Sequence, residues 1–290
     1  MIAIFGKTLP DNFLPQVNSV ISLFNASNTS YTCIKKLYDE LKSRGLDLHC
    51  QTYNSSDDLP NNTTLILCLG GDGTMLETLT IVKNRQIPIV GINTGKLGFL
   101  SEIFPHEIEQ SLEYLLCGKY NIQSRTLIEV LSNDIEIPTY NFALNDFTLR
   151  KNDQSTLVQI SVSVDNCFLN SYWADGLIIS TATGSTAYSM SVGGPILVPE
   201  SRCLILSPIA SHNLTVRPVV IEKNSLIDIT IEGRDDFHVA TFDNRNIQVP
   251  SHTKFRVRAA DFTLNIAQLP NHHFFNTLRN KLMWGVDKRN

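Results

Sequence analysis

The sequence has 290 residues, 42% of them hydrophobic and 18% charged, with a formal net charge of −4. This composition is typical of a soluble protein long enough for two domains with a substantial core. Because no surplus of basic residues exists to neutralise phosphates, nucleic acid is not expected as the main partner. No membrane association is expected either, because Met1 leads directly into a short apolar strand and neither a signal peptide nor a transmembrane run follows.

The cysteines and histidines indicate neither disulfides nor a zinc site. The six cysteines stand far apart at 33, 50, 68, 117, 167 and 203 and form no CxxC pair. We therefore expect reduced thiols and a cytoplasmic protein. None of the seven histidines has a metal-ligand spacing such as HExxH, and no nucleophile triad is supported.

The first 120 residues alternate between strand-like and helix-like patterns. Strands are expected at 2–5, 46–53, 65–69 and 87–92, and helices from Ile34 to a stop at Gly45, over 74–84 and from Pro105 onward. Such alternation predicts a parallel sheet with helices on its faces. Ligands bind such sheets at the carboxyl ends of the strands.

The central stretch of this half is the apolar run Leu65–Leu69, which leads into Gly-Gly-Asp-Gly-Thr at 70–74. Five consecutive apolar residues predict a strand buried on both faces, and Thr74 opens a helical pattern. A strand, a glycine turn and a helix N-terminus together form an anion site. Since Asp72 would repel a bare phosphate, we interpret it as a ligand of a metal that the phosphate also binds, or as a base that takes a proton from an attacking hydroxyl.

An ordinary strand-to-helix turn also explains this loop, with Asp72 as a turn former and Thr74 as an N-cap. Two familiar phosphate loops do not fit. The Walker pattern needs a Lys that is absent here, and Leu76 stands where a dinucleotide fingerprint needs Gly. The loop at 93–100 falls at the same sheet edge, where Asn93 is either a ligand-facing group or a turn residue.

From Asn121 onward, short alternating runs rich in Val, Ile, Thr and Phe predict antiparallel β-structure, most simply a sandwich. These runs lie at 127–131, 142–150, 156–164, 204–209, 214–221, 225–232, 237–242 and 254–266. The segment 271–284 is helix-like again. We therefore predict an α/β domain over 1–120, a β-rich, sandwich-like domain over 121–270, and a C-terminal helix within 271–290 that packs back on the first domain.

Polar groups interrupt the second half at three places. Asn145-Asp146 breaks an apolar strand, so Asp146 faces either a cleft or the solvent. Asp175 precedes an apolar strand that leads into the hydroxyl-rich stretch 183–191. These side chains could hydrogen-bond sugar hydroxyls, amides and phosphates, although such a run is more often a loop. The segment 243–245 is most simply a hairpin turn.

Together these motifs closely resemble those of bacterial NAD kinases, in order and over nearly the whole chain. The resemblance rests on Gly70–Thr74, Asn93–Leu100, Asn145–Asp146, Asp175–Ser189, Gly193–Ile196 and Phe275–Leu278. The first motif is shared with lipid kinases and, in related form, with phosphofructokinases, whereas the long motif at 175–189 makes the match specific. The resemblance implies transfer of the γ-phosphoryl group of ATP to the 2′-hydroxyl of the adenosine ribose of NAD, with Mg²⁺ or another divalent cation accompanying ATP.

The resemblance also implies roles for individual residues. Asp72 would take the proton of the 2′-hydroxyl, and Gly73 would lie beside the same ribose. The phosphates of ATP would meet Gly70, Gly71, Gly73, Thr74 and Asn93. Asn145 and Asp146 would hold the adenosine, and the rest of NAD would contact Asp175, Thr186, Ala187, Tyr188, Ser189, Met190 and Ser191. Family members are homo-oligomers, so a dimer or tetramer is expected.

Three positions depart from the family pattern. Asp146 replaces the usual Glu and reaches less far, Ala182 replaces a common Pro, and Arg245 stands where Gln is usual. The role of that Gln is therefore not carried over. Asp175 is the carboxylate that would favour the positively charged NAD over NADH, and whether ATP or polyphosphate is the donor stays open.

Three other functions remain alternatives at this point. A lipid kinase of the diacylglycerol type shares the glycine loop but would need an apolar acceptor pocket. A dinucleotide-dependent oxidoreductase would need a GxGxxG loop, which the chain lacks. A non-catalytic NAD-binding protein would have no use for Asp72.

Overall fold

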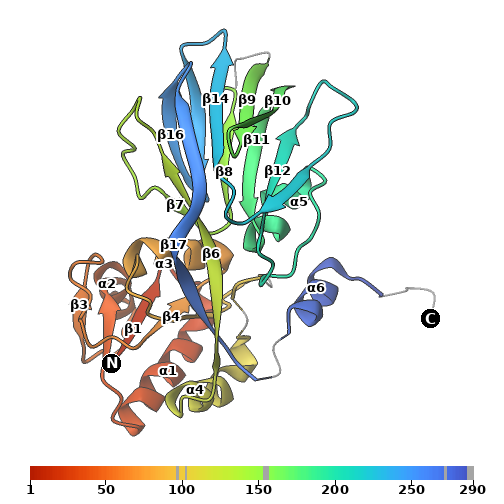
Figure 1. The fold of residues 1–290 in the computed structure, drawn as a ribbon. Helices are drawn as coiled ribbons and strands as arrows, with labels where there is room; N and C mark the ends of the chain where they lie inside the picture. Colours follow the sequence, from red (N-terminus) through yellow and green to blue (C-terminus); the bar gives the residue numbers. More distant parts are fainter. Residues whose placement is uncertain (96–97, 102, 153–156, 271–272, 286–290) are drawn as a thin grey trace. The chain divides into compact units, whose positions relative to one another are not determined.

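The computed structural model describes residues 1–95, 98–101, 103–152, 157–270 and 273–285. The chain forms two compact units: unit 1 contains Met1–Ser124 and Leu264–Asn290, and unit 2 contains Arg125–Thr263. Two long strands, β6 (Asn121–Leu131) and β17 (Lys254–Gln268), contribute residues to both units (Figure 1).

Unit 1 contains a parallel sheet in the order β3-β2-β1-β4-β5, which the end of β17 extends beside β5. Its strands are β1 (Ile2–Gly6), β2 (Tyr31–Ile34), β3 (Gln51–Tyr53), β4 (Leu65–Leu69) and β5 (Ile89–Ile92). Every residue of β4 is buried, as its continuous apolar run predicted. The strand predicted at 46–53 is shorter, and β2 was not predicted because Ile34 was assigned to the following helix.

The helices of unit 1 bury one apolar face each. They are α1 (Leu14–Ala26), α2 (Lys35–Ser43), α3 (Asp72–Val82), α4 (Ile108–Leu116) and α6 (Phe274–Leu282), with 3₁₀ turns η1 (Asp11–Phe13) and η2 (Pro105–Glu107). Helices α1 and α4 lie side by side (Figure 1). Helix α1 was not predicted, although its buried Val17, Val20, Ile21 and Phe24 follow helical spacing. The C-terminal helix is confirmed, and residues 271–272 and 286–290 of its predicted range lie outside the described residues.

The order of the strands creates a switch point beside the glycine loop. The chain passes from β1 outward to β2 and β3, and then returns across the sheet to β4 and β5. The carboxyl ends of β1 and β4 are therefore neighbours, with Gly6 opposite Leu69. In open α/β sheets, ligands bind in the crevice at such a point.

Unit 2 consists of two antiparallel sheets (Figure 1). One has the order β10-β9-β14-β17 with β6 and β7 alongside, and the other has the order β13-β12-β11-β8-β15-β16. Their further strands are β7 (Phe142–Ala143), β8 (Asp146–Arg150), β9 (Val158–Val164), β10 (Cys167–Ala174), β11 (Gly176–Thr181), β12 (Cys203–Ile209), β13 (Val219–Glu222), β14 (Ile227–Gly233), β15 (Phe237–Phe242) and β16 (Arg245–Pro250).

One apolar core joins the two sheets of unit 2 and confirms the predicted sandwich. The Phe147 ring lies 5.0 Å from that of Phe242 in its own sheet and 5.3 Å from that of Phe255 in the other. Strands β10 and β16 were not predicted. Each is the second arm of a hairpin, and β10 follows a turn in which Asp165 and Asn166 have φ of 50° and 65°.

Two short helical segments follow β11: a 3₁₀ turn, η3 (Thr183–Thr186), and the single helical turn α5 (Tyr188–Ser191). Thr156, the first residue of the run predicted at 156–164, lies outside the described residues. Within the part of the chain that the structure describes, no helix is long and apolar enough to span a membrane.

Candidate active site

The glycine loop of unit 1 joins β4 to α3 at the switch point. Helix α3 begins at Asp72, two residues before the predicted start, because the extended Gly71 is its N-cap and accepts hydrogen bonds from the N–H groups of Thr74 (3.0 Å) and Met75 (3.1 Å). The N–H groups that precede the first intrahelical bond are those that bind anions at helix N-termini. A Cβ on Gly70 would collide with the Thr74 side chain, whereas the space beside Gly71 and Gly73 is open.

The carboxylate of Asp72 is held by the backbone of a second loop. Its Oδ2 accepts the N–H of Phe99 at 2.8 Å, and its Oδ1 accepts those of Leu100 at 2.9 Å and Ser101 at 3.3 Å. A Cβ on Gly98 would collide with Asp72 Oδ1, so glycine there lets the carboxylate keep this position. Because the side chain of Asp72 remains 29% exposed, a reactant or a metal can still reach this fixed carboxyl group.

Asn93 follows β5 and has a turn role in this loop. Its Oδ1 accepts the N–H of Gly95 at 2.8 Å, and its own N–H donates to the carbonyl of Ile103 at 2.8 Å. The loop is tied to the glycine loop, since the N–H of Gly70 donates to the carbonyl of Ile92 at 3.0 Å. These two bonds are typical of a turn residue, while Lys96 and Leu97 of the same motif lie outside the described residues.

Asn145 and Asp146, at the start of β8, are held by a carboxylate that the sequence did not reveal. The buried Asp243 accepts the N–H groups of Leu144 at 2.9 Å, Asn145 at 2.7 Å and Asp146 at 3.2 Å. Asp243 lies in the two-residue turn between β15 and β16 with φ of 55°, so the predicted hairpin is confirmed. The sequence contained one signal for this role of Asp243, because an Asp in a hairpin turn can accept hydrogen bonds from backbone N–H groups.

Arg245 supports the same region from the other side of the turn. Its guanidinium group donates to the carbonyl of Tyr140 at 2.6 Å and to that of Phe142, and its Nη2 lies 3.8 Å from Asp243 Oδ2. Arg245, which departs from the family pattern, thus links the hairpin to the segment that leads into Asn145. It also supplies a positive charge beside the buried carboxylate of Asp243.

Asp146 faces the interior, which excludes the solvent-facing alternative. It is 5% exposed, and its Oδ1 accepts the hydroxyl of Thr148 at 3.2 Å. Burial, together with the charge of the neighbouring Asp243, raises the pKa of Asp146 to about 7, against the lowering effect of the bond from Thr148. Burial also raises the pKa of Asp243, opposed by its three backbone N–H bonds and by Arg245.

The turn after β11 packs directly on Asn145. The carbonyl of Asn145 accepts the N–H of Thr181 at 2.9 Å and the hydroxyl of Ser180 at 3.2 Å. A Cβ on Gly184 would collide with the same carbonyl group, so the turn needs glycine there. Unit 2 therefore brings the Asn145 segment, the Asp243 hairpin and the hydroxyl-rich turn together as one cluster.

Most hydroxyl groups of this turn bond within the protein, so the predicted polar wall is only partly present. Ser189 is buried and its Oγ lies 3.0 Å from Ser207 Oγ, while Ser191 Oγ donates to the carbonyl of Tyr188 at 2.7 Å. Ser185 likewise bonds the carbonyl of Ala182. The predicted residues that reach the surface are Thr186, Ala187, Tyr188, Met190 and Ser191.

Asp175 is not brought together with this cluster. It precedes β11, whereas Asn145 contacts the residue that ends β11, so about 17–20 Å of extended strand separates the two positions at about 3.3 Å per residue. Asp175 Oδ1 lies 2.9 Å from Lys151 Nζ. The positive charge of Lys151 therefore offsets part of the negative charge of Asp175.

Comparison with known proteins decides the family. The family model of the ATP-NAD kinase N-terminal domain matches residues 13–120, and that of the ATP-NAD kinase C-terminal domain matches residues 144–269. An NAD kinase of Flavobacterium psychrophilum is 40% identical over 100% of this chain and 99% of its own length. One from Cytophaga hutchinsonii is 38% identical over 100% of both chains. The chain belongs to the NAD kinase family.

Two solved structures share the fold of this NAD kinase family member. Yeast NADH kinase complexed with NADH superposes with a TM-score of 0.90 at 21% identity, covering 99% of this chain and 88% of the other. An NAD kinase from Archaeoglobus fulgidus in complex with ATP superposes with a TM-score of 0.74 at 22% identity, covering 97% and 98%. The predicted fold class is thereby confirmed.

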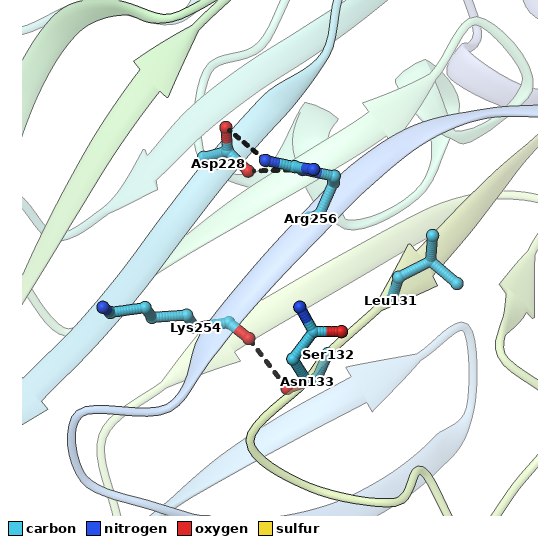
Figure 2. A pocket seen from close by; sticks show the side chains of 6 residues that line it. All are labelled: Leu131, Ser132, Asn133, Asp228, Lys254 and Arg256. Carbon is cyan, nitrogen blue, oxygen red and sulfur yellow. Dashed lines mark hydrogen bonds and ion pairs between the residues drawn. The ribbon is translucent and has the colours of Figure 1, made fainter.

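A separate cavity of about 190 Å³ lies in unit 2 of this NAD kinase family member and contains none of the predicted site residues. Figure 2 shows Arg256 paired with Asp228, and Ser132 bonded to the carbonyl of Lys254. Lys254 lines this cavity and is therefore a lysine that lies outside the candidate site. Over the described ranges, no group of three or more His, Cys, Asp or Glu could hold a metal ion.

Proposed function

We propose that this member of the NAD kinase family transfers the γ-phosphoryl group of ATP to the 2′-hydroxyl of the adenosine ribose of NAD, and so produces NADP and ADP. The observation that carries this proposal is the carboxylate of Asp72, fixed by three backbone N–H groups at the mouth of an anion-binding loop. Full-length identity of 40% to an NAD kinase disfavours the lipid kinase and the non-catalytic alternatives.

In this mechanism Asp72 accepts the proton of the 2′-hydroxyl as its oxygen attacks the γ-phosphorus. The residues of the glycine loop, Gly70, Gly71, Gly73 and Thr74, receive the phosphates of ATP at the N-terminus of α3, with Asn93 ordering the neighbouring loop. Phosphoryl transfer depends on positioning and charge stabilisation more than on covalent chemistry. A loop of fixed backbone donors with one fixed carboxylate meets that need.

A divalent cation, most simply Mg²⁺, would arrive with ATP. Magnesium is usually held by one or two carboxylates together with substrate phosphates and water rather than by a protein cage. Because Asp72 is assigned to the proton, the ion would be held chiefly by the phosphates of ATP and by water. When bound, the ion neutralises phosphate charge.

The cluster of unit 2 would hold NAD. Asn145 and Asp146 are proposed to bind the adenosine, with Asp243 and Arg245 fixing their backbone. The surface groups of the hydroxyl-rich turn, Tyr188 above all, would contact the rest of the dinucleotide. Ser189 is assigned the supporting role that its buried bond to Ser207 describes.

Asp175 is proposed to face the nicotinamide half and to favour NAD over NADH. Its ion pair with Lys151 weakens this preference, because the lysine offsets part of the negative charge. We expect NAD to be preferred by about tenfold or less, given an interaction of about 4 kcal/mol for two charges 4 Å apart at an effective dielectric of 20 before desolvation and the lysine are counted.

Assembly and compartment are further parts of the proposal. We propose a homo-oligomer, which sedimentation would reject if an active sample were a monomer near 32.5 kDa. We also propose a cytoplasmic location. All six cysteines are free, which suits a reducing compartment.

One assay tests the proposed function. ATP and Mg²⁺ are offered with NAD, NADH or diacylglycerol in separate reactions, and NADP is read by a dehydrogenase that accepts only NADP. Formation of NADP from NAD is expected. Phosphorylation of the lipid, or of neither nucleotide, would overturn the proposal, and equal rates with NADH would remove only the argument on Asp175.

A further inference from the structure

Lys281 brings a positive charge to the glycine loop from the far end of the chain. Its Nζ lies 3.6 Å from Asp72 Oδ2. The same Nζ lies 4.4 Å from the centroid of the Phe99 ring, within the range of a cation–π contact. Because the N–H of Phe99 binds Asp72 Oδ2, a single residue holds both charges in place.

Packing of α6 sets the position of this lysine. Phe274, Leu278 and Lys281 are separated by four and three residues, so they share one side of the helix. Leu278 is 5% exposed, and the ring of Phe274 lies 6.4 Å from that of Phe99. The ammonium group is therefore delivered by a packed helix face, unlike the long side chains of a loose surface ion pair.

The ammonium group of Lys281 makes no short hydrogen bond with Asp72. Their separation of 3.6 Å exceeds the distance of about 2.7–2.9 Å of a charge-assisted hydrogen bond. The side chains of Lys281 and Asp72 are 31% and 29% exposed. An ammonium group has three N–H donors, so Lys281 can donate to an anion that arrives beside Asp72.

The reaction needs a cation at this position. A triphosphate that approaches the glycine loop is repelled by the carboxylate that must accept the proton, since like charges close together disfavour each other. During transfer, charge spreads over the oxygens of the γ-phosphoryl group and is stabilised by fixed cations aimed at them. Lys281 is the ion-pair partner of Asp72 in the described part of the chain.

We propose that Lys281 is a catalytic residue whose ammonium group binds an oxygen of the transferring γ-phosphoryl group beside Asp72. The proposal rests on the proposed function, since it requires ATP at this loop. The 2′-oxygen forms its bond to the γ-phosphorus, and the bond from that phosphorus to the bridging oxygen breaks with its electron pair left on ADP. The hydroxyl proton passes to Asp72. Lys281 stays protonated and supplies charge alone.

The test compares Lys281→Gln and Lys281→Arg with Lys254→Gln, which removes a lysine from the cavity of unit 2 (Figure 2). Wild type and Lys254→Gln should form NADP at similar rates. Lys281→Gln should lower kcat by roughly 10²–10³-fold, the usual loss for one fixed group that stabilises transition-state charge. Its KM for NAD should stay within about threefold, and Lys281→Arg should keep more activity because it keeps the charge.

A rescue experiment separates charge from packing. Ethylammonium should restore part of the activity of Lys281→Ala, whereas tetramethylammonium, which has charge but no N–H, should not. A kcat for Lys281→Gln within about threefold of that for Lys254→Gln would overturn the proposal. So would an equal loss in Lys281→Arg without rescue, because the residue would then serve only to seat α6. A wild-type protein that forms no NADP would overturn the proposed function itself.

Discussion

The glycine loop of unit 1 and the Asn145 cluster of unit 2 both place carboxylates against backbone N–H groups, but the two regions expose them very differently. Asp72 accepts three such bonds and remains 29% exposed next to Lys281. Asp243 also accepts three, yet its side chain is only 1% exposed and lies beside Asp146. The same kind of backbone bond can therefore present an acid to a reactant or hold a neighbouring segment in place.

The largest effect is expected at the exposed acid. Asp72→Asn cannot take the hydroxyl proton, so kcat should fall by roughly 10²–10⁴-fold. The fold should be retained, because water can reach this 29% exposed side chain and satisfy the donor that the amide nitrogen faces. KM for NAD should change little, because the loss concerns the transition state. Steady-state kinetics measure both constants, with Asp57→Asn, an exposed acid of the same unit, as the control. Near-normal turnover would remove Asp72 from the chemistry.

The loop that holds Asp72 offers a sharper test of position. In Gly98→Ala the new Cβ would collide with Asp72 Oδ1, so the carboxylate must move. A displacement of about 1 Å can cost up to about 10² in rate, and a loss of kcat of about 10–10²-fold is expected. Gly95→Ala is the matched control, because a Cβ there meets nothing within 4 Å. Equal rates for the two variants would contradict the role of this loop.

In the buried cluster the expected loss is in binding. Asp243→Asn turns an amide N–H₂ toward backbone donors, so the segment that carries Asn145 should loosen and KM for NAD should rise by about tenfold. At least one donor is left unsatisfied, which typically costs about 1–3 kcal/mol of the free energy of unfolding. Asp236→Asn, in an exposed turn of the same unit, is the control. A fall in kcat with unchanged KM would contradict this prediction, because Asp243 would then affect the chemical step rather than NAD binding.

The last expected effect concerns stability rather than kinetics, and it is a change in pH dependence. The pKa of Asp146 rises from 3.8 to about 7 on folding, so the folded state favours the protonated acid. This contribution is fully present below about pH 4 and is lost as the pH rises through 7, by an amount on the order of a few kcal/mol. In Asp146→Asn the free energy of unfolding should therefore fall less between pH 5 and 8. Urea unfolding at pH 5 and 8 measures this, and an unchanged slope would reject the buried acid.

Local patterns predicted the elements whose signals are local. The apolar run of β4 and the glycines after it specify a strand and an anion loop, and the 3.6-residue spacing of α1 would have predicted that helix as well. The start of α3 was misplaced because Gly71, rather than a side chain, caps the helix.

The contacts of the site residues could not be predicted, because their partners lie far along the chain. Asp72 contacts Phe99 and Lys281, and Asn145 bonds Asp243. These partners are too far apart in the sequence for a local pattern to predict the contacts. The polar wall predicted for the hydroxyl-rich turn is only partly present for a related reason. Ser and Thr side chains bond nearby backbone as readily as they bond a ligand. The hairpin at Asp243 was predicted as a turn, but its burial depends on the strands around it.

Calorimetric titration of NAD into Asp72→Asn and Asp243→Asn, side by side with the wild type, tests the division of labour between the two regions most directly. Asp72→Asn should bind NAD with an affinity within about threefold of the wild type, and Asp243→Asn should bind it about tenfold more weakly. Equal losses in both variants, or a loss confined to Asp72→Asn, would contradict the assignment of chemistry to the glycine loop and of NAD binding to the Asn145 cluster.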